Sequence, residues 1–366
     1  MRDFVEQCAH CVSRPVTATP HAGPESSVET KMDERLVREQ LREALGTIRP
    51  LVTLSREGLV LTALNWGVDR PATYETASAA ARDGALELRE QAVGTVPSIE
   101  AVTKEKPVVL FAGDTVVGGK QNRIINVTVW LAAMKVTSIP VSCLELGRWN
   151  QGYGFSASRK VDYLLRAKMS AQLADIALME RDLAAAAPGD ARAPRRSYAA
   201  DQGAVWREIA DKEERAHARS RTSALHDLYA REATDNAAFV RAFPCPAGAT
   251  GVAVGIGGKL VALELFDAPS TLAEQWPRLV EGAASAYADH RRAVAAGAEP
   301  APRHRYPDEG ALRRLLDRAT KACADAVVGA SVGEGSDVRL RGEKVRGGSL
   351  VVDGHPVHIE LFRVEA

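Results

Sequence analysis

The sequence predicts an α+β fold, with a mixed or antiparallel β-rich core that contains hairpins and is covered by several amphipathic helices. Three observations predict it. Apolar runs of strand length alternate with tight-turn residues over much of 51–145. The middle and last third contain longer segments with apolar residues at three- and four-residue steps, which is the helical period. A short hairpin motif also occurs twice in the last third.

The N-terminal region lacks the patterns of a folded segment. Residues 1–48 are rich in polar residues and proline and have no sustained period, so we expect a disordered tail followed by a single α+β domain over 49–366. The tail contains Cys8-Ala9-His10-Cys11. A structural zinc site needs four ligands, normally two such pairs, and there is no second pair in the sequence. We therefore predict no metal site, and the role of this segment stays open.

The first half of the domain reads as a series of strands. We expect strands over 58–64 and 86–93, with a short Ala-rich helix between them that ends near Gly84. Residues 108–111 and 116–117 flank an Ala-Gly-Asp turn, which predicts that they pair as a hairpin. In the next strand, Ile125, Val127, Val129 and Leu131 share one face.

Helices and a repeat follow. The spacing predicts one amphipathic helix over 161–176 and another that begins at Gly203. The segments 258–266 and 354–362 both match G-x-x-V-x-[LI]-E-L-F, and each follows an apolar strand and a turn that tolerates positive φ. We predict two related hairpins in one sheet or in pseudo-symmetric positions. Shared strand composition without a structural relation is the alternative.

Composition excludes several classes of protein. The formal net charge is +0 and the pI is about 7.1, so no overall field attracts nucleic acid or acidic membranes. The five cysteines form no spaced framework, which fits a reducing compartment. We find neither a signal-peptide core nor an apolar stretch of membrane-spanning length. We expect a cytoplasmic protein without a membrane partner; protein partners and cofactors stay unknown.

Two polar segments at the ends of apolar strands are the strongest functional signal. They are 118–123, with the sequence Gly-Gly-Lys-Gln-Asn-Arg, and 142–149, which ends in Gly-Arg-Trp. The first is not a P-loop, because Gln121 replaces the required hydroxyl and β-branched residues follow where a helix should begin. Glycines beside cations nevertheless suit an anion, since backbone N–H groups can approach the ligand closely. Strand ends are also where folds commonly place binding sites.

Each residue type in these segments suits a part of a phosphorylated nucleotide. Arginine grips phosphate with two donors, amides read a sugar or base edge, and an indole stacks on a base. The ligand-binding residues predicted here are Gly118, Gly119, Lys120, Gln121, Asn122, Arg123, Arg148 and Trp149.

Glu145 is the predicted catalytic residue, as a general acid or base. It shares a strand face with Ile139, Val141 and Cys143, and partial desolvation there favours proton transfer near neutral pH. Cys143 is a weaker candidate for a nucleophile. The alternative is structural: Arg123 or Arg148 forms a buried ion pair with Glu145, and the amides satisfy loop backbone.

Taken in order, these segments resemble a family of mostly bacterial proteins named for its association with ADP-ribosylglycohydrolases and rhodanese/phosphatase-superfamily proteins. The resemblance begins near Leu51 and extends to the C-terminus, and its matching features include Gly118 to Arg123, Gly147 to Trp149 and Gln202 to Trp206. It implies a single α+β domain and a role in NAD or ADP-ribose metabolism. It adds Asn126, Gln202 and Trp206 to the predicted ligand-binding residues.

Three functions are therefore open. The first is a protein that binds an ADP-ribose-like or other phosphorylated nucleotide, with or without hydrolysis of it. The second is a non-catalytic nucleotide-sensing or partner-binding module, in which Glu145 only holds an arginine. The third is a structural protein whose polar segments merely close the fold.

Overall fold

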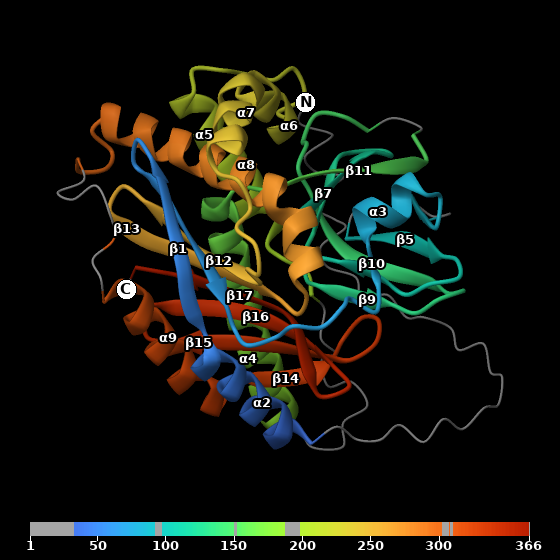
Figure 1. Cartoon of the computed structure of the whole chain (residues 1–366). Helices are drawn as coiled ribbons and strands as arrows, with labels where there is room; N and C mark the ends of the chain where they lie inside the picture. Colours follow the sequence, from blue (N-terminus) through green and yellow to red (C-terminus); the bar gives the residue numbers. More distant parts are fainter. Residues whose placement is uncertain are drawn as a thin grey trace. The chain divides into compact units, whose positions relative to one another are not determined.

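The computed structural model describes residues 33–91, 97–149, 152–186, 198–301, 307 and 310–365. These residues form antiparallel sheets, a closed barrel and several helices, so the predicted α+β class is confirmed. Figure 1 shows the barrel beside the largest sheet.

The largest sheet is eight-stranded and antiparallel throughout. Helix α8 (Pro269–Ala295) lies over β2, β12 and β13, while α4 (Tyr163–Ala186) crosses the other face (Figure 1). In order across the sheet, the strands are β1 (Arg49–Arg56), β2 (Leu59–Asn65), β12 (Gly251–Ile256), β13 (Lys259–Phe266), β17 (His355–Arg363), β16 (Val345–Val352), β15 (Ser336–Gly342) and β14 (Val327–Ala330).

The two copies of the repeated motif form hairpins in this sheet, as predicted. β12 pairs with β13 and β16 pairs with β17, and the copies meet where β13 pairs with β17. The turn residues Gly257, Gly258, Asp353 and Gly354 all have positive φ, which two-residue hairpin turns require. Glu264 and Glu360 are register partners, so the two motif glutamates lie next to each other on neighbouring strands.

The closed barrel is antiparallel and has an apolar interior that includes Ile99, Val116, Ile125 and Val141. In order, its strands are β10 (Val136–Cys143), β5 (Ser98–Thr103), β4 (Leu86–Arg89), β11 (Gly154–Lys160), β7 (Asp114–Gly118) and β8 (Arg123–Ile125).

The hairpin predicted for 108–111 and 116–117 is wrong. β6 (Val108–Leu110) belongs to a separate three-stranded sheet with β3 (Glu75–Thr76) and β9 (Val129–Leu131), whereas β7 belongs to the barrel. Gly113, with φ of 85°, turns the chain between the two sheets, and its N–H donates to the carbonyl of Ile125. The turn was predicted correctly, but the strands on its two sides have different partners.

The tail prediction is wrong for its last residues. Helix α2 (Glu34–Thr47) lies within the segment expected to be disordered, and it buries Val37, Leu41, Ala44 and Leu45. Those residues recur at helical spacing, but charged residues surround them and hid the period. Residues 1–32, including the Cys-Ala-His-Cys segment, lie outside the described residues.

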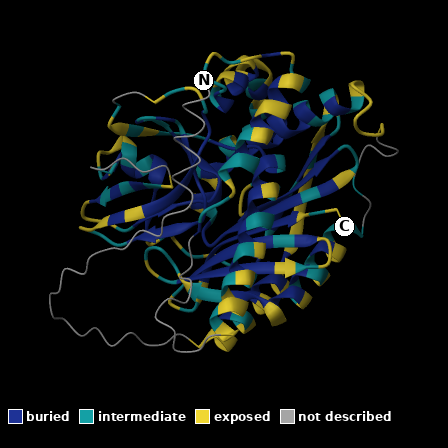
Figure 2. Cartoon of the chain, turned by 180° about the vertical axis from the view of Figure 1, so that it is seen from behind, coloured by how far each residue is buried: buried dark blue, intermediate teal, exposed yellow. Residues whose placement is uncertain are grey.

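The remaining helices pack around the sheet and the barrel. Figure 2 shows buried strands inside and exposed residues concentrated on helices and turns. The helices are α3 (Ala77–Arg82), α5 (Gln202–Arg215), α6 (Leu225–Arg231), α7 (Ala233–Ala242) and α9 (Ala311–Ala322), with the 3-10 turn η2 (Cys323–Asp325) after α9.

Candidate functional site at the barrel mouth

The two predicted polar segments meet at one end of the barrel, which we call the barrel mouth. β8 pairs with both β7 and β10, and Arg123 is the register partner of Cys143. Because side chains alternate along a strand, Arg123 shares the inner face of β8 with Ile125, a residue of the barrel core. The sequence therefore brings the segments together through neighbouring strands.

Arg123 is a fully buried cation with incomplete hydrogen bonding. Its Nη1 donates to Gln121 Oε1 at 2.9 Å and to Cys143 Sγ at 2.6 Å. Its nearest carboxylate in a described residue is Glu90, with 3.6 Å between Arg123 Nη2 and Glu90 Oε1. The Nε and Nη2 groups of Arg123 have no hydrogen-bond acceptor among the described residues. A buried guanidinium left in this state favours an added acceptor.

Lys120 and Trp149 cover this end of the barrel. Lys120 Nζ lies 5.0 Å from the centre of the Trp149 ring, and Arg123 Cζ lies 6.0 Å from it. The indole is 41% exposed, so one aromatic ring in contact with solvent lies near two cations. No carboxylate of a described residue forms an ion pair with Lys120.

The Gly118-Gly119 turn allows this approach. Gly118 and Gly119 have φ of 119° and 50°. A Cβ atom on Gly119 would lie 2.2 Å from the Phe155 ring and 2.8 Å from Glu90 Oε1. The Lys120 N–H donates to the same Glu90 oxygen at 2.8 Å. Glycine is therefore required here both for backbone conformation and for space.

Glu145 and Arg148 form an ion pair next to this turn. Glu145 Oε2 accepts from Arg148 Nε at 2.9 Å and from the Asn122 N–H at 3.3 Å, while Oε1 accepts from Thr222 Oγ1 at 2.7 Å. Arg148 also donates to the carbonyls of Gly118 and Gly119 at 3.2 Å and 3.0 Å. This is the ion pair anticipated as the structural alternative. A general acid/base role for Glu145 stays a prediction, and the carboxylate accepts hydrogen bonds from three donors.

The other predicted residues lie outside the mouth. Asn126 directly follows β8, donates to the Tyr198 carbonyl at 3.0 Å and accepts from Ser142 Oγ at 2.9 Å. Gln202 bonds both backbone groups of Cys143, at 2.7 Å and 2.9 Å, and so fixes α5 against β10. Trp206 lies one turn further along α5, and its Nε1 is buried without a hydrogen-bond partner among the described residues.

A second polar cluster was missed by the sequence analysis. We call it the Glu264 cluster: Glu264, Lys160, Tyr163, Arg166, His358 and Glu360. Glu264 Oε1 lies 3.0 Å from Lys160 Nζ and 3.1 Å from His358 Nε2, and its Oε2 accepts from Arg166 Nη1 at 2.8 Å and from the Tyr163 hydroxyl at 3.2 Å.

The Glu264 cluster is fully enclosed and its charges are matched. Arg166 Nη2 donates to Glu360 Oε2 at 2.9 Å, so one guanidinium joins the two motif glutamates. Burial alone raises a carboxyl pKa, but Arg166 and Lys160 outweigh it and hold the pKa of Glu264 well below its ordinary value. The repeated E-L-F motif is the signal that marks these glutamates.

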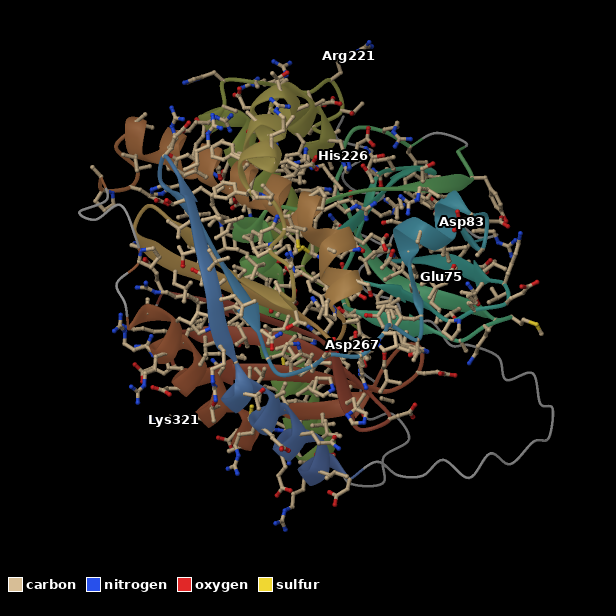
Figure 3. All side chains as sticks on the ribbon, viewed as in Figure 1. Glu75, Asp83, Arg221, His226, Asp267 and Lys321 are labelled. Atoms are coloured by element: carbon tan, nitrogen blue, oxygen red, sulfur yellow. The ribbon has the colours of Figure 1, made fainter. Side chains whose placement is uncertain are left out.

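His226 is a third buried polar group, on α6 beside the barrel strand β7 (Figure 3). The Thr115 hydroxyl donates to the Arg159 carbonyl at 2.8 Å, so its oxygen accepts from His226 Nε2 at 3.2 Å. Nδ1 then carries the lone pair, and it has no partner among the described residues. Burial, with Arg159 nearby, lowers the pKa of His226 to about 4.

The described residues contain neither a cluster of metal ligands nor a helix that could span a membrane. No three His, Cys, Asp or Glu side chains there lie in an arrangement that would hold a metal ion. No helix there has the length and apolar character needed to cross a membrane.

Comparison with known proteins identifies the family. A sequence model of the ARPP-1 domain, described as "ARG and Rhodanese-Phosphatase-superfamily-associated Protein domain", matches residues 49–362. The chain belongs to the ARPP-1 family. The resemblance recognised in the sequence is thereby confirmed, and the match begins where the predicted domain does. No curated protein and no solved structure matches the chain.

Proposed function

We propose that this ARPP-1 chain binds a phosphorylated nucleotide of the ADP-ribose type at the barrel mouth, as part of NAD or ADP-ribose metabolism. Lys120 and Arg123 hold phosphate oxygens, and Trp149 stacks on the base. The Glu145–Arg148 ion pair holds the glycine turn in place through the hydrogen bonds of Arg148 to its carbonyls. The observation that carries the proposal is the incomplete hydrogen bonding of buried Arg123 next to Lys120 and the Trp149 ring.

The chemistry of these groups supports an anionic ligand with a flat ring. Phosphate oxygens are strong acceptors for guanidinium and ammonium donors, and stacking on an aromatic side chain contributes about 1–3 kcal/mol per base. The family description, which names ARG and the rhodanese and phosphatase superfamilies, supports a ligand from ADP-ribose chemistry. It does not assign a reaction.

We propose binding without turnover as the form of this function. Glu145 accepts hydrogen bonds from a guanidinium, a hydroxyl and a backbone N–H, which leaves it poorly placed to take a proton from water. Mass spectrometry of ADP-ribose and NAD after incubation with the native chain tests for turnover: unchanged ligands support binding alone, and a new product would contradict it.

Isothermal titration with ADP-ribose, NAD, AMP and inorganic phosphate tests binding. Lys120→Ala is expected to weaken binding about tenfold, the equivalent of one charge-assisted hydrogen bond. Lys135→Ala is the matched control, because Lys135 is exposed and lies just before the start of β10, the opposite end of the strand from Cys143. No heat with any of the four ligands at millimolar concentration, or equal loss in both variants, would contradict the proposal.

A further inference from the structure

A hollow between α2 and α9 collects positive charge on a chain with no net charge. Its volume is about 560 Å³, within the usual range of small-molecule sites. The residues that line it come from α2, from the end of α9 and from η2: Arg35, Arg38, Glu39, Arg42, Thr320, Lys321, Cys323 and Ala324. Figure 1 shows α2 and α9 side by side, away from the barrel strands.

The cations of α2 lie on one face of the helix. Arg35, Arg38 and Arg42 follow one another at three- and four-residue steps, so they form a stripe. Arg38 is fixed in position: its Nε donates to the Ala326 carbonyl at 2.9 Å, and its Nη2 lies 2.8 Å from Glu34 Oε2. The stripe is therefore anchored at its middle residue.

The far wall of the hollow adds another cation. Lys321 is exposed in the last turn of α9, and Figure 3 places it where α9 lies next to α2. The lining contains one carboxylate, Glu39, which already pairs with Arg35 at 3.0 Å. Neither Arg42 nor Lys321 forms an ion pair with any described residue. Two cations on opposite walls are thus available to an anion.

The neighbouring hollow has a smaller excess of positive charge. The neighbouring hollow of about 400 Å³ shares Lys321 and contains Arg314, Arg318 and Arg341, but Asp317, Asp325 and Glu343 balance them. A polynucleotide needs a long basic surface that follows its backbone, and the stripe of α2 contains only three arginines and borders one hollow, which suits a compact anion. Because α2 precedes residue 49, half of the site lies outside the matched family domain.

We propose that the α2/α9 hollow is a second ligand site, which binds a compact small molecule carrying adjacent phosphate groups. Arg42 and Lys321 contact the phosphates from opposite walls, and the Thr320 hydroxyl supplies a further donor. Arg38, which is bonded to Glu34 and to the Ala326 carbonyl, holds α2 in position. This site is independent of the barrel mouth.

Calorimetric titration of inorganic pyrophosphate into the full chain carrying Lys120→Ala tests this site, because that background weakens phosphate binding at the mouth. Arg42→Glu and Lys321→Glu are each expected to raise the Kd for pyrophosphate about tenfold or more. Arg313→Glu is the matched control: Arg313 is an exposed cation of α9 that does not line the hollow, and the change is expected to leave the Kd within about twofold. Thermal unfolding of each variant confirms that it is folded.

ADP is titrated in the same proteins to separate two sources of the phosphates. Parallel losses for ADP and pyrophosphate support a site that reads phosphates alone, and a tighter Kd for ADP supports a nucleotide ligand of the same site. Absence of pyrophosphate binding at millimolar concentration, or an equal effect of Arg313→Glu and Lys321→Glu, overturns the proposal. Failure of pyrophosphate to bind at the α2/α9 hollow does not affect the barrel-mouth proposal, because ADP-ribose binding at the barrel mouth is expected to depend on Lys120.

Discussion

The barrel mouth and the Glu264 cluster each bury an arginine, but they treat its charge differently. Arg166 reaches Glu264 and Glu360 at 2.8 Å and 2.9 Å, so its charge is balanced by two carboxylates. Arg123 has one carboxylate at 3.6 Å and otherwise bonds the neutral Gln121 and Cys143 side chains. Burial alone therefore does not mark a binding site. We propose that a buried cation whose charge is incompletely balanced, next to an exposed ring, does mark one.

The largest expected effect comes from replacing each arginine by methionine. Arg166→Met removes the ion pairs of two buried carboxylates and is expected to lower the free energy of unfolding by about 3–5 kcal/mol. Arg123→Met leaves only Glu90 without its cation and is expected to cost about 1–3 kcal/mol. Urea unfolding of both variants measures the difference. Equal costs would remove the distinction between the two regions.

A buried group should stay neutral where desolvation outweighs the nearby carboxylates, and His226, with Glu145 and Asp227 in its surroundings, tests this. Its pKa falls from 6.5 to about 4 on folding, so the unfolded chain binds the proton more readily. Stability from this group is complete above pH 6.5 and falls as the pH drops toward 4, by about 3 kcal/mol in total. The gap in unfolding free energy between the native chain and His226→Gln should narrow by that amount over this range. A gap that does not change with pH would show that His226 has the same pKa in the folded and the unfolded chain.

The glycine turn of the mouth should tolerate no side chain. Gly119→Ala brings a Cβ atom within 2.2 Å of Phe155, and it is expected to cost about 2 kcal/mol and to weaken ADP-ribose binding at least about tenfold. Gly84→Ala provides the control, because Gly84 also has positive φ, at 66°, but has open space around it. The difference in unfolding free energy between the two variants isolates the steric cost. Similar values for both would mean that the turn is not tightly packed.

The smallest effect on stability is expected at the exposed ring. Trp149 is 41% exposed, so Trp149→Ala should change the unfolding free energy by no more than about 0.5 kcal/mol. Loss of stacking should nevertheless weaken nucleotide binding about tenfold and leave inorganic phosphate binding nearly unchanged. Calorimetry with ADP-ribose and phosphate compares the two ligands. Equal weakening of both would assign Trp149 to positioning of the cations.

Local patterns predicted much of the fold and the meeting of the two polar segments. The repeat that contains Glu264 depends on neighbouring residues, and a sequence displays those directly. The single strand predicted to carry Ile125 and Leu131 is wrong, because the structure has two strands there, β8 in the barrel and β9 in the three-stranded sheet. The end of β7 and the end of β10 lie together because β8 pairs with both. Strand-end placement was therefore sufficient to predict a shared location for Lys120 and Trp149.

Features formed by residues that are distant in sequence could not be predicted from local patterns. The hairpin prediction for β6 and β7 failed because each strand has partners elsewhere, and short-range spacing contains no information about closure of a barrel. The Glu264 cluster joins positions 160, 166, 264 and 358, which are distant in sequence. Helix α2 was missed because its apolar residues are few and its charged residues many.

A crystal structure of the chain with ADP-ribose tests the central claim most directly. We expect phosphate oxygens within hydrogen-bond distance of Lys120 Nζ and Arg123 Nη2, the base stacked on the Trp149 ring, and the Glu145–Arg148 pair unchanged. A ligand seated elsewhere, with Arg123 still bonded only to Gln121, Cys143 and Glu90, would contradict it.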